Sequence, residues 1–187
     1  INEHYGVPTV AHLTCVSSTR ETVRAKIEEI RRAGIENIMA LRGDLTPAME
    51  GQDRSAWAYR HASDLIAELR GEGFCIGGAC YPEVHPESSC QKDDIKYLKE
   101  KVDAGCDFLT TQMFFDNEKY FEFVRRAREM GINVPIIPGI KPIHRLSQMN
   151  ILPKTFRVDL PDELVAELQK CKDDEAATAV GREWCIA

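Results

Sequence analysis

Three short stretches of this 187-residue sequence place polar and ionisable side chains at or just after apolar runs. They are Arg42-Gly43-Asp44, the segment from Tyr81 to His85, and Gln112 within residues 107–115. Arginine can pair with a phosphate through two hydrogen bonds, glycine lets the backbone approach a ligand closely, and tyrosine can stack on a ring. An amide side chain can both donate and accept hydrogen bonds. These residue types suit a flat heterocycle that carries phosphates, although Arg42-Gly43-Asp44 alone would equally fit a solvated ion pair in an ordinary loop.

Other chemistries find less support in the sequence. No cysteine has an obvious base partner, and no Gly-x-Gly-x-x-Gly motif follows an apolar run, so a Rossmann nucleotide site is not supported. A metal site built from His12 and His85 with carboxylates such as Asp44 is weak, because these residues are widely separated in the sequence. A metal-dependent barrel hydrolase that uses the two histidines stays open as an alternative.

Composition narrows the class of protein. A formal net charge of -6 argues against a nucleic-acid binder, which usually carries a basic stripe. No apolar stretch approaches the roughly 20 residues that span a bilayer, and the first residues lack the features of a signal peptide. The seven cysteines are odd in number, widely spaced and without a Cys-x-x-Cys motif, so we expect a reduced, cytoplasmic protein without a zinc site.

Alternating strand and helix patterns must position the polar residues. Apolar runs predict five strands, at residues 7–16, 37–41, 74–81, 107–115 and 134–140, and apolar residues at helical spacing lie between them. Ser18 and Glu21 have the spacing of a capping box for the first of these helices. The interval of roughly 30 residues is typical of strand-helix-strand units with a parallel sheet. Because the carboxyl ends of such strands meet at one edge, we expect the polar residues to converge there.

The pattern changes after Pro153, where two helices and no final strand are predicted, and residues 46–55 are predicted to form a polar loop. A complete (β/α)8 TIM barrel usually needs roughly 200 to 250 residues. The sequence therefore predicts an α/β protein that forms the middle of such a barrel, as one domain over residues 1–187.

Six ordered motifs resemble the methylenetetrahydrofolate reductase family, and the likeness covers the chain from end to end. They are Ala11-His12-Leu13-Thr14-Cys15, Ala40-Leu41-Arg42-Gly43-Asp44, Tyr81-Pro82-Glu83-Val84-His85-Pro86-Glu87, Leu98-Lys99-Glu100-Lys101-Val102-Asp103-Ala104-Gly105, Thr111-Gln112-Met113-Phe114-Phe115-Asp116 and Ile137-Pro138-Gly139-Ile140. The resemblance implies a (β/α)8 barrel that holds FAD, with this chain covering roughly strands 3 to 7.

The resemblance also implies a reaction in one-carbon and methionine metabolism. NAD(P)H would reduce the flavin, and the reduced flavin would convert 5,10-methylenetetrahydrofolate to 5-methyltetrahydrofolate. We expect NAD(P)H and the folate as small-molecule partners, a homo-oligomer, and neither nucleic acid nor membrane as a partner.

The family's flavin contacts fall on twelve residues of this chain. They are His12, Leu41, Arg42, Gly43, Asp44, His61, Ala79, Tyr81, His85, Asp94, Lys101 and Thr110. His61 departs from a tyrosine often found at its position. By composition alone, Lys101 would be a solvated lysine and Asp94 a charge favoured by a helix N-terminus.

Three residues match positions that act on the folate. Asp44 would stabilise the cationic iminium form of the substrate and make flavin reduction harder. Gln112 would hydrogen-bond the pterin edge, and Leu152 would contact folate or nicotinamide. No residue here matches the family's general-acid glutamate, so we expect the chain alone to be catalytically incomplete. Because the five strands would have open edges at both ends, we also expect the isolated chain to be poorly soluble or to aggregate. A non-catalytic truncated barrel that binds flavin or folate is the second alternative.

Overall fold

A computed structural model gives the fold and describes residues 2–46, 49, 57–85 and 87–186. Most of the loop predicted at residues 46–55 lies outside the described residues. The chain divides into two compact units: unit 1 comprises Ile1–Ala79, Lys96–Thr110 and Ile132–Ile136, and unit 2 comprises Cys80–Ile95, Thr111–Gly131 and Ile137–Ala187. The single-domain organisation of residues 1–187 stays a prediction.

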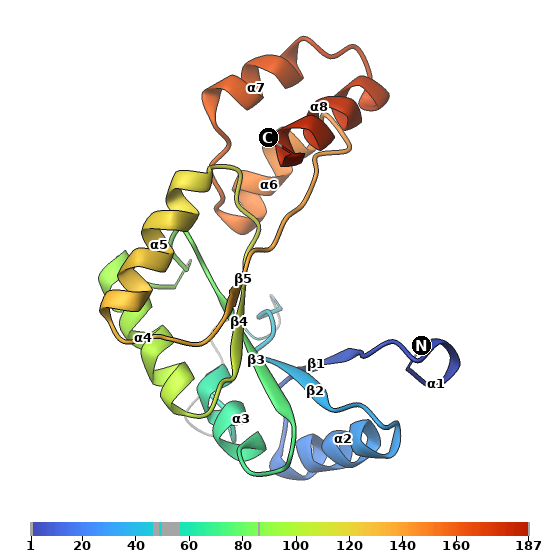
Figure 1. The fold of residues 1–187 in the computed structure, drawn as a ribbon, viewed down its shortest axis with the longest axis vertical. Coiled ribbons are helices and arrows are strands. Elements are labelled where there is room, and N and C mark those ends of the chain that lie inside the picture. The colour runs from blue at the N-terminus through green and yellow to red at the C-terminus, as the bar shows by residue number, and fades with distance from the viewer. Residues whose placement is uncertain (1, 47–48, 50–56, 86, 187) are drawn as a thin grey trace. The chain divides into compact units, whose positions relative to one another are not determined.

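The strands form one five-stranded sheet in the order β1-β2-β3-β4-β5 (Figure 1). Their bounds are β1 Val10–Thr14, β2 Asn37–Leu41, β3 Cys75–Cys80, β4 Phe108–Thr111 and β5 Ile136–Ile137. β1 pairs parallel with β2, and β2 pairs parallel with β3. A parallel pair needs a crossover, and here helices α2 to α5 each connect one strand to the next. The predicted α/β class is confirmed, and the sequential strand order is that of a barrel wall rather than of a doubly wound sheet.

The helices include those predicted between the strands and the two predicted after Pro153, and α1 was not predicted. Their bounds are α1 Asn2–Tyr5, α2 Arg20–Arg32, α3 Ala62–Leu69, α4 Gln91–Asp103, α5 Asn117–Glu129, α6 Gln148–Phe156, α7 Asp162–Gln169 and α8 Asp174–Ile186. Within the described ranges, none of these helices combines the length and the apolar character that crossing a membrane requires.

The capping box predicted for α2 is wrong by one residue. The N-cap is Thr19, whose hydroxyl oxygen accepts a hydrogen bond from the backbone N of Thr22 at 3.2 Å. The Thr19 backbone N donates in return to the Thr22 hydroxyl at 3.0 Å. Two reciprocal bonds satisfy two helix-terminal donors, which Ser18 and Glu21 do not.

Unit 1 is held together by apolar side chains of the strands and of two helices. Leu13, Ile38 and Leu109 are buried on three strands, and helices α2 and α3 lie beside each other and present further buried residues (Figure 1). These are Val23 and Ile27 on α2 and Leu65, Ile66 and Leu69 on α3. Each fully buried side chain of this size contributes roughly 1.5–3 kcal/mol. The core therefore fixes the strands whose carboxyl ends carry the polar residues.

Unit 2 has its own core, to which helices α6 to α8 contribute. The cluster of buried residues is Phe115, Ile143, Leu152, Val158, Leu164, Leu168 and Ala177. The indole nitrogen of Trp184 on α8 donates to the carbonyl of Phe115 at 2.9 Å. Gly181 lets α8 approach closely, because a Cβ there would lie 2.2 Å from the carbonyl oxygen of Ile143. The C-terminal helices therefore pack on the segments that follow β4 and β5.

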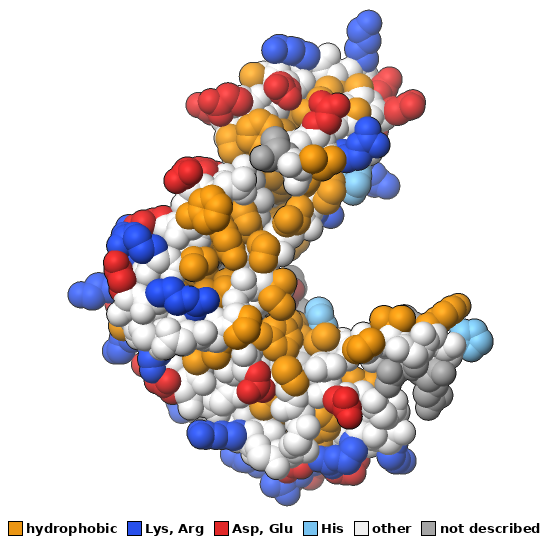
Figure 2. Space-filling model, in the orientation of Figure 1, with side chains coloured by type: hydrophobic (Ala, Val, Ile, Leu, Met, Phe, Trp, Pro, Cys, Tyr) orange, Lys and Arg blue, Asp and Glu red, His pale blue; other side chains and the backbone are white. Residues whose placement is uncertain are grey.

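Some apolar surface remains uncovered in the described residues. Figure 2 shows apolar side chains along the N-terminal segment, where Tyr5, Val7 and Val10 are exposed. Nothing in the structure shows what covers this segment. Aggregation of the isolated chain remains a prediction that exposed sheet edges support.

Candidate functional site

The residues predicted from the sequence fall into two sets, one in each unit. The rim set of unit 1 contains His12, Leu41, Arg42, Gly43, Asp44, His61, Ala79, Lys101 and Thr110. The loop set of unit 2 contains Tyr81, His85, Asp94, Gln112 and Leu152.

The Arg42-Gly43-Asp44 turn is fixed to the chain that leaves β1. The Arg42 carbonyl accepts hydrogen bonds from the backbone N of Cys15 at 3.1 Å and of Val16 at 2.7 Å, so the pairing of β1 with β2 continues beyond the strands. Gly43 has a φ of +93°, and a Cβ there would lie 2.8 Å from Cγ1 of Val16. The turn therefore requires glycine both for its backbone conformation and for the close approach of Val16. Asp44, next along the chain, is exposed.

His12 lies on β1, directly opposite Met39 in the β1–β2 register. Its side chain is exposed, while Leu13 beside it is buried. Successive strand residues point to opposite faces, so His12 and Thr14 share the face away from the Leu13 side. The two faces of β1 therefore differ in exposure.

Lys101 and Ala79 are brought together by the fold. The Lys101 ammonium on α4 donates to the Ala79 carbonyl near the end of β3, with an N–O distance of 2.5 Å. The lysine stem passes Gly78, where a Cβ would lie only 3.0 Å from the Lys101 Cδ. Lys101 is half-buried, so the solvated lysine expected from composition is wrong, and the fold instead places a cation at the end of β3.

The remaining members of the rim set are two strand residues and a helix cap. Leu41 is the half-buried last residue of β2, and its carbonyl accepts from the backbone N of Cys15 at 3.2 Å. Thr110 is half-buried on β4. His61 precedes α3 with an exposed side chain, and its backbone N donates to the Asp64 carboxylate at 2.9 Å. The same carboxylate accepts from the backbone N of Arg60 at 2.8 Å. Asp64 therefore fixes the backbone that carries the His61 ring.

Three members of the loop set contact one another after β3. The rings of Tyr81 and His85 meet edge to face, with centroids 4.6 Å apart. The His85 backbone N donates to the Asp94 carboxylate at 3.2 Å, and the Ser88 hydroxyl donates to its other oxygen at 2.9 Å. Asp94 lies in the first turn of α4, as expected of a helix N-terminal charge, and it also anchors the loop.

The His85 ring has a defined hydrogen-bonding orientation. Its Nδ1 accepts a hydrogen bond from the backbone N of Glu87 at 3.1 Å. In the neutral imidazole this assigns the proton to Nε2, because one ring nitrogen accepts and the other donates. His85 thus presents an N–H donor at Nε2.

Sequence reasoning missed a network around Glu83. The Glu83 carboxylate contacts the Lys119 ammonium at 3.0 Å and accepts from the backbone N of Asp159 at 3.1 Å. Partial burial alone would lower the pKa of Lys119, but the hydrogen bonds and charges of Asp159 and Glu83 outweigh it and raise the pKa above its ordinary value. No local spacing could reveal these partners, which lie 36 and 76 residues from Glu83 in the sequence.

Gln112 and Leu152 occupy different surroundings. The Gln112 backbone N donates to the Cys80 carbonyl at 2.8 Å, and its half-buried side-chain oxygen accepts from the backbone N of Met113 at 3.0 Å. Leu152 is only 2% exposed and belongs to the core of unit 2. Its contact with folate or nicotinamide stays a prediction that this placement does not favour.

Two buried thiols and the possible metal ligands bear on the alternative chemistries. Burial raises the pKa of Cys15 and of Cys106 to about 11, so both thiols are neutral near pH 7 and poor nucleophiles. Among the described residues, no group of three or more His, Cys, Asp or Glu side chains is placed to hold a metal ion. The metal-hydrolase alternative gains no support from them.

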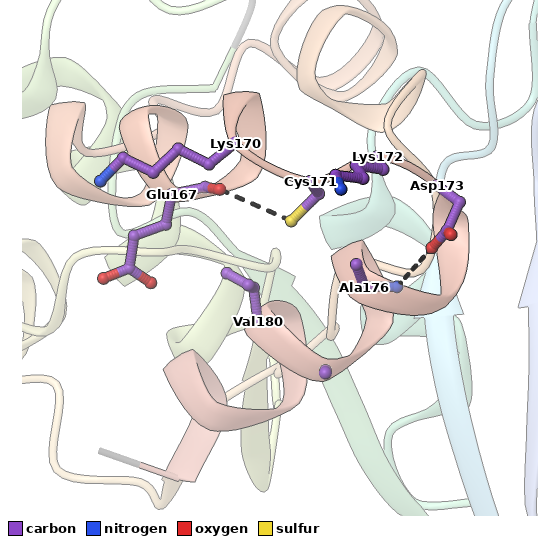
Figure 3. A pocket seen from close by; sticks show the side chains of 8 residues that line it. Glu167, Lys170, Cys171, Lys172, Asp173, Ala176 and Val180 are labelled. Carbon is purple, nitrogen blue, oxygen red and sulfur yellow. Dashed lines mark hydrogen bonds between the residues drawn. The ribbon is translucent and has the colours of Figure 1, made fainter.

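Two surface hollows lie away from the predicted residues. The larger, of about 580 Å³, lies between the end of α7 and α8, where the Cys171 thiol points to the Glu167 carbonyl (Figure 3). The smaller, of about 350 Å³, is lined by residues 17–21 together with Trp57 and Ala58. Neither hollow is lined by a residue predicted to bind cofactor or substrate.

The fold is a parallel α/β sheet with crossover helices. In unit 1 Arg42, Gly43 and Asp44 follow β2, and in unit 2 the segment from Tyr81 to His85 follows β3. The family model described as methylenetetrahydrofolate reductase matches residues 1–187. The chain belongs to the methylenetetrahydrofolate reductase family.

Individual relatives agree with this assignment. A probable methylenetetrahydrofolate reductase (NADPH) of Caenorhabditis elegans is 38% identical over 98% of this chain and 28% of the relative. Methylenetetrahydrofolate reductase (NADH) 1 of Arabidopsis thaliana is 38% identical over 94% of the chain and 32% of the relative. The 5,10-methylenetetrahydrofolate reductase of Escherichia coli is 38% identical over 95% of the chain and 58% of the relative. The chain thus spans about a third to just over half the length of these relatives.

One solved structure is similar to this chain, and the likeness concerns the fold only. It is described as an uncharacterized protein from Clostridium thermocellum that binds two copies of 5-methyl-5,6,7,8-tetrahydrofolic acid. The TM-score is 0.50 at 16% sequence identity, over 95% of this chain and 81% of that one.

Proposed function

We propose that the intact protein containing this chain reduces 5,10-methylenetetrahydrofolate to 5-methyltetrahydrofolate, with FAD as cofactor and NAD(P)H as electron donor. The observation that carries the proposal is the family match over all 187 residues, because it includes every motif that supplies a proposed ligand. A homo-oligomer in the cytoplasm is part of the same proposal. The seven free cysteines are compatible with a reducing compartment.

The donor sets fit a cofactor with phosphates and a hydrogen-bonding ring. In unit 1, Arg42 offers a guanidinium that can bind phosphate bidentately, and the Lys101 ammonium is held at the end of β3. In unit 2, Tyr81 offers an aromatic ring and His85 an N–H donor at Nε2. When bound, FAD would supply the two-electron relay between the nicotinamide and the methylene carbon of the folate.

Asp44 would act through its charge. It is an exposed carboxylate on a turn fixed by the Arg42 carbonyl, so it can face a ligand without a change of backbone. A unit charge about 4 Å away interacts by about 1 kcal/mol in water and about 4 kcal/mol at an effective dielectric constant of 20. Asp44 would therefore stabilise positive charge on the folate during its reduction, and it would oppose reduction of the flavin.

Gln112 would bind the pterin edge, since an amide can match a donor and an acceptor together. A separate proton donor is needed to open the five-membered ring of the folate. Glu83 does not suit this role, because its carboxylate already receives hydrogen bonds from Lys119 and from the Asp159 backbone. The proposal therefore assigns the proton donor to a residue other than Glu83.

The Asp44→Asn variant of the intact protein tests the proposal in two half-reactions. Flavin reduction by NAD(P)H should be unchanged or faster, whereas oxidation of the reduced enzyme by methylenetetrahydrofolate should slow by about 10- to 1000-fold, the range for loss of about 1.4–4 kcal/mol of electrostatic stabilisation. The exposed Asp162 on α7 provides a matched control, and Asp162→Asn should leave both rates unchanged. Slower flavin reduction with normal folate reduction would contradict the assigned role.

A further inference from the structure

Glu83 occupies the middle of the loop that carries Tyr81 and His85, and its carboxylate faces protein donors. Its side chain is 15% exposed. One oxygen lies 3.0 Å from the Lys119 ammonium, and both oxygens lie 3.1 Å from the backbone N of Asp159. Lys119 also pairs with the carboxylate of Asp159. The loop after β3 is thereby joined to the start of α5 and to the segment between α6 and α7.

This arrangement differs from the exposed ion pairs of the same unit. Glu122 on α5 pairs with Arg125 and Arg126, but its side chain is 38% exposed and all three residues share one helix. Exposed pairs of this kind contribute little, typically about 0–1 kcal/mol. The Glu83 carboxylate instead has little contact with water and receives charge-assisted hydrogen bonds from two distant segments, which makes its loss more costly.

The loop is held on either side of Glu83 as well. The Gln91 amide of α4 donates to the Pro82 carbonyl at 3.4 Å, and the His85 backbone N donates to Asp94. Glu83 lies between these two anchors and ties the loop to α5 rather than to α4. Without the Glu83 carboxylate, the loop would lose these hydrogen bonds to Lys119 on α5 and to the backbone of Asp159.

We propose that Glu83 is a positioning residue, which acts with Lys119 and Asp159 to fix the ring geometry of Tyr81 and His85 for the cofactor. This rests on the proposed flavin-dependent function. Glu83 itself does not touch the cofactor in this account. Its effect passes through the backbone of residues 81–85.

The chemistry of the network predicts a graded series of variants. Glu83→Gln keeps the size of the side chain, but its NH2 group cannot accept the hydrogen bonds that a carboxylate oxygen accepts. Lys119→Met removes the ammonium and leaves the bonds from the Asp159 backbone. Asp159→Asn keeps the backbone donor and the Glu83–Lys119 pair. The loosening of the loop should therefore be largest in Glu83→Gln, smaller in Lys119→Met and smallest in Asp159→Asn. Lys119→Arg keeps a cation at this position, so its loop should be nearly as well ordered as in the wild type.

The first readout is hydrogen exchange of the intact protein without flavin. Backbone amides of His85, Ser88 and Asp159 are hydrogen-bonded within this network or the loop it fixes, so they report on it directly. Glu83→Gln should raise their exchange by about tenfold or more, the scale for loss of a hydrogen bond to a charged group. Glu122→Gln, which also removes a glutamate from ion pairs in unit 2, should leave these amides unchanged.

The second readout is the Kd of FAD for the flavin-free protein, measured by quenching of flavin fluorescence. The increase in this Kd should be largest in Glu83→Gln and smallest in Asp159→Asn, the same ranking as for the exchange rates. Unchanged exchange at all three amides in Glu83→Gln would overturn the proposal. Should that variant fail to fold, Lys119→Met decides, and exchange equal to that of Glu122→Gln would overturn it.

The two proposals fail in different ways. A wild-type protein that binds no FAD overturns the proposed function and the role of the loop in cofactor binding. Faster exchange with an unchanged FAD Kd overturns the positioning role while leaving the flavin-dependent function intact.

Discussion

Replacing Gly43 by alanine should destabilise the protein through two separable effects. With a φ of +93°, an alanine would adopt a left-handed backbone conformation that costs roughly 1–2 kcal/mol. Its Cβ would also lie 2.8 Å from Cγ1 of Val16 and 3.2 Å from Cβ of Thr14, and overpacking of this kind costs about 1–3 kcal/mol. The expected total is about 2–5 kcal/mol.

Gly71 provides the matched control for this substitution. Its φ of +86° is similar, but no atom lies within 4 Å of where a Cβ would be. Gly71→Ala should therefore show only the backbone cost of roughly 1–2 kcal/mol. The two variants isolate the contact with Val16 from the conformational strain.

Urea unfolding of the intact protein measures both variants, provided that the slope of each transition matches that of the wild type. Gly43→Ala should lower the free energy of unfolding by about 1–3 kcal/mol more than Gly71→Ala. It should also weaken FAD binding, because the backbone of the turn must move. Equal destabilisation by the two variants would refute the argument that the turn is packed against the chain leaving β1.

Four further predictions concern buried and charged groups. Lys101→Met should weaken FAD binding by about tenfold or more through loss of the cation at the end of β3, and a Kd equal to that of the wild type would remove Lys101 from the site. Glu68→Gln should lower the melting temperature by several degrees, because the mostly buried Glu68 carboxylate accepts hydrogen bonds from Arg20 and Arg24 on α2 and from the buried Tyr59. A melting temperature equal to that of the wild type would show that these hydrogen bonds do not stabilise the fold. At pH 8, iodoacetamide should label the exposed Cys90 but not Cys15 or Cys106 unless urea is added, as peptide mapping would show. Burial raises the folded-state pKa of both thiols from 9.0 to about 11, so the stability that each contributes is present below pH 9 and is lost as the pH rises to 11. The free energy of unfolding should fall by up to about 3 kcal/mol for each thiol over this range. In Cys15→Ala, the decrease in the free energy of unfolding between pH 8 and pH 10.5 should be smaller than in the wild type.

Much of the fold could be predicted because local patterns agree with the tertiary structure. Residues 38–41 are all apolar, and the three central residues of the run 37–41 are buried in β2. The last strand shows the limit of such patterns. The apolar pattern of residues 134–140 predicted a seven-residue strand, but β5 comprises only Ile136–Ile137. Pro135 and Pro138 flank it, and proline lacks the N–H that a longer ladder requires.

The site could be predicted by residue type better than by interaction. Arg42, Gly43 and Asp44 were identifiable because they follow an apolar run, and the structure explains the glycine through its positive φ. The burial of Lys101 was not predictable, because its contact is with a backbone carbonyl that has no signature in the sequence. The partners of Glu83 were missed for the same physical reason, since tertiary packing alone brings α5 and the segment after α6 to the loop.

The most direct test of the central claim is the visible absorbance of the intact protein under anaerobic conditions. We expect the protein to contain bound FAD with its absorbance band at about 450 nm. This absorbance should be lost when NADH or NADPH is added, and it should recover when 5,10-methylenetetrahydrofolate is then added. A protein that binds no flavin would contradict the account. Bound flavin whose absorbance does not change when NADH or NADPH is added would instead favour a non-catalytic binding module.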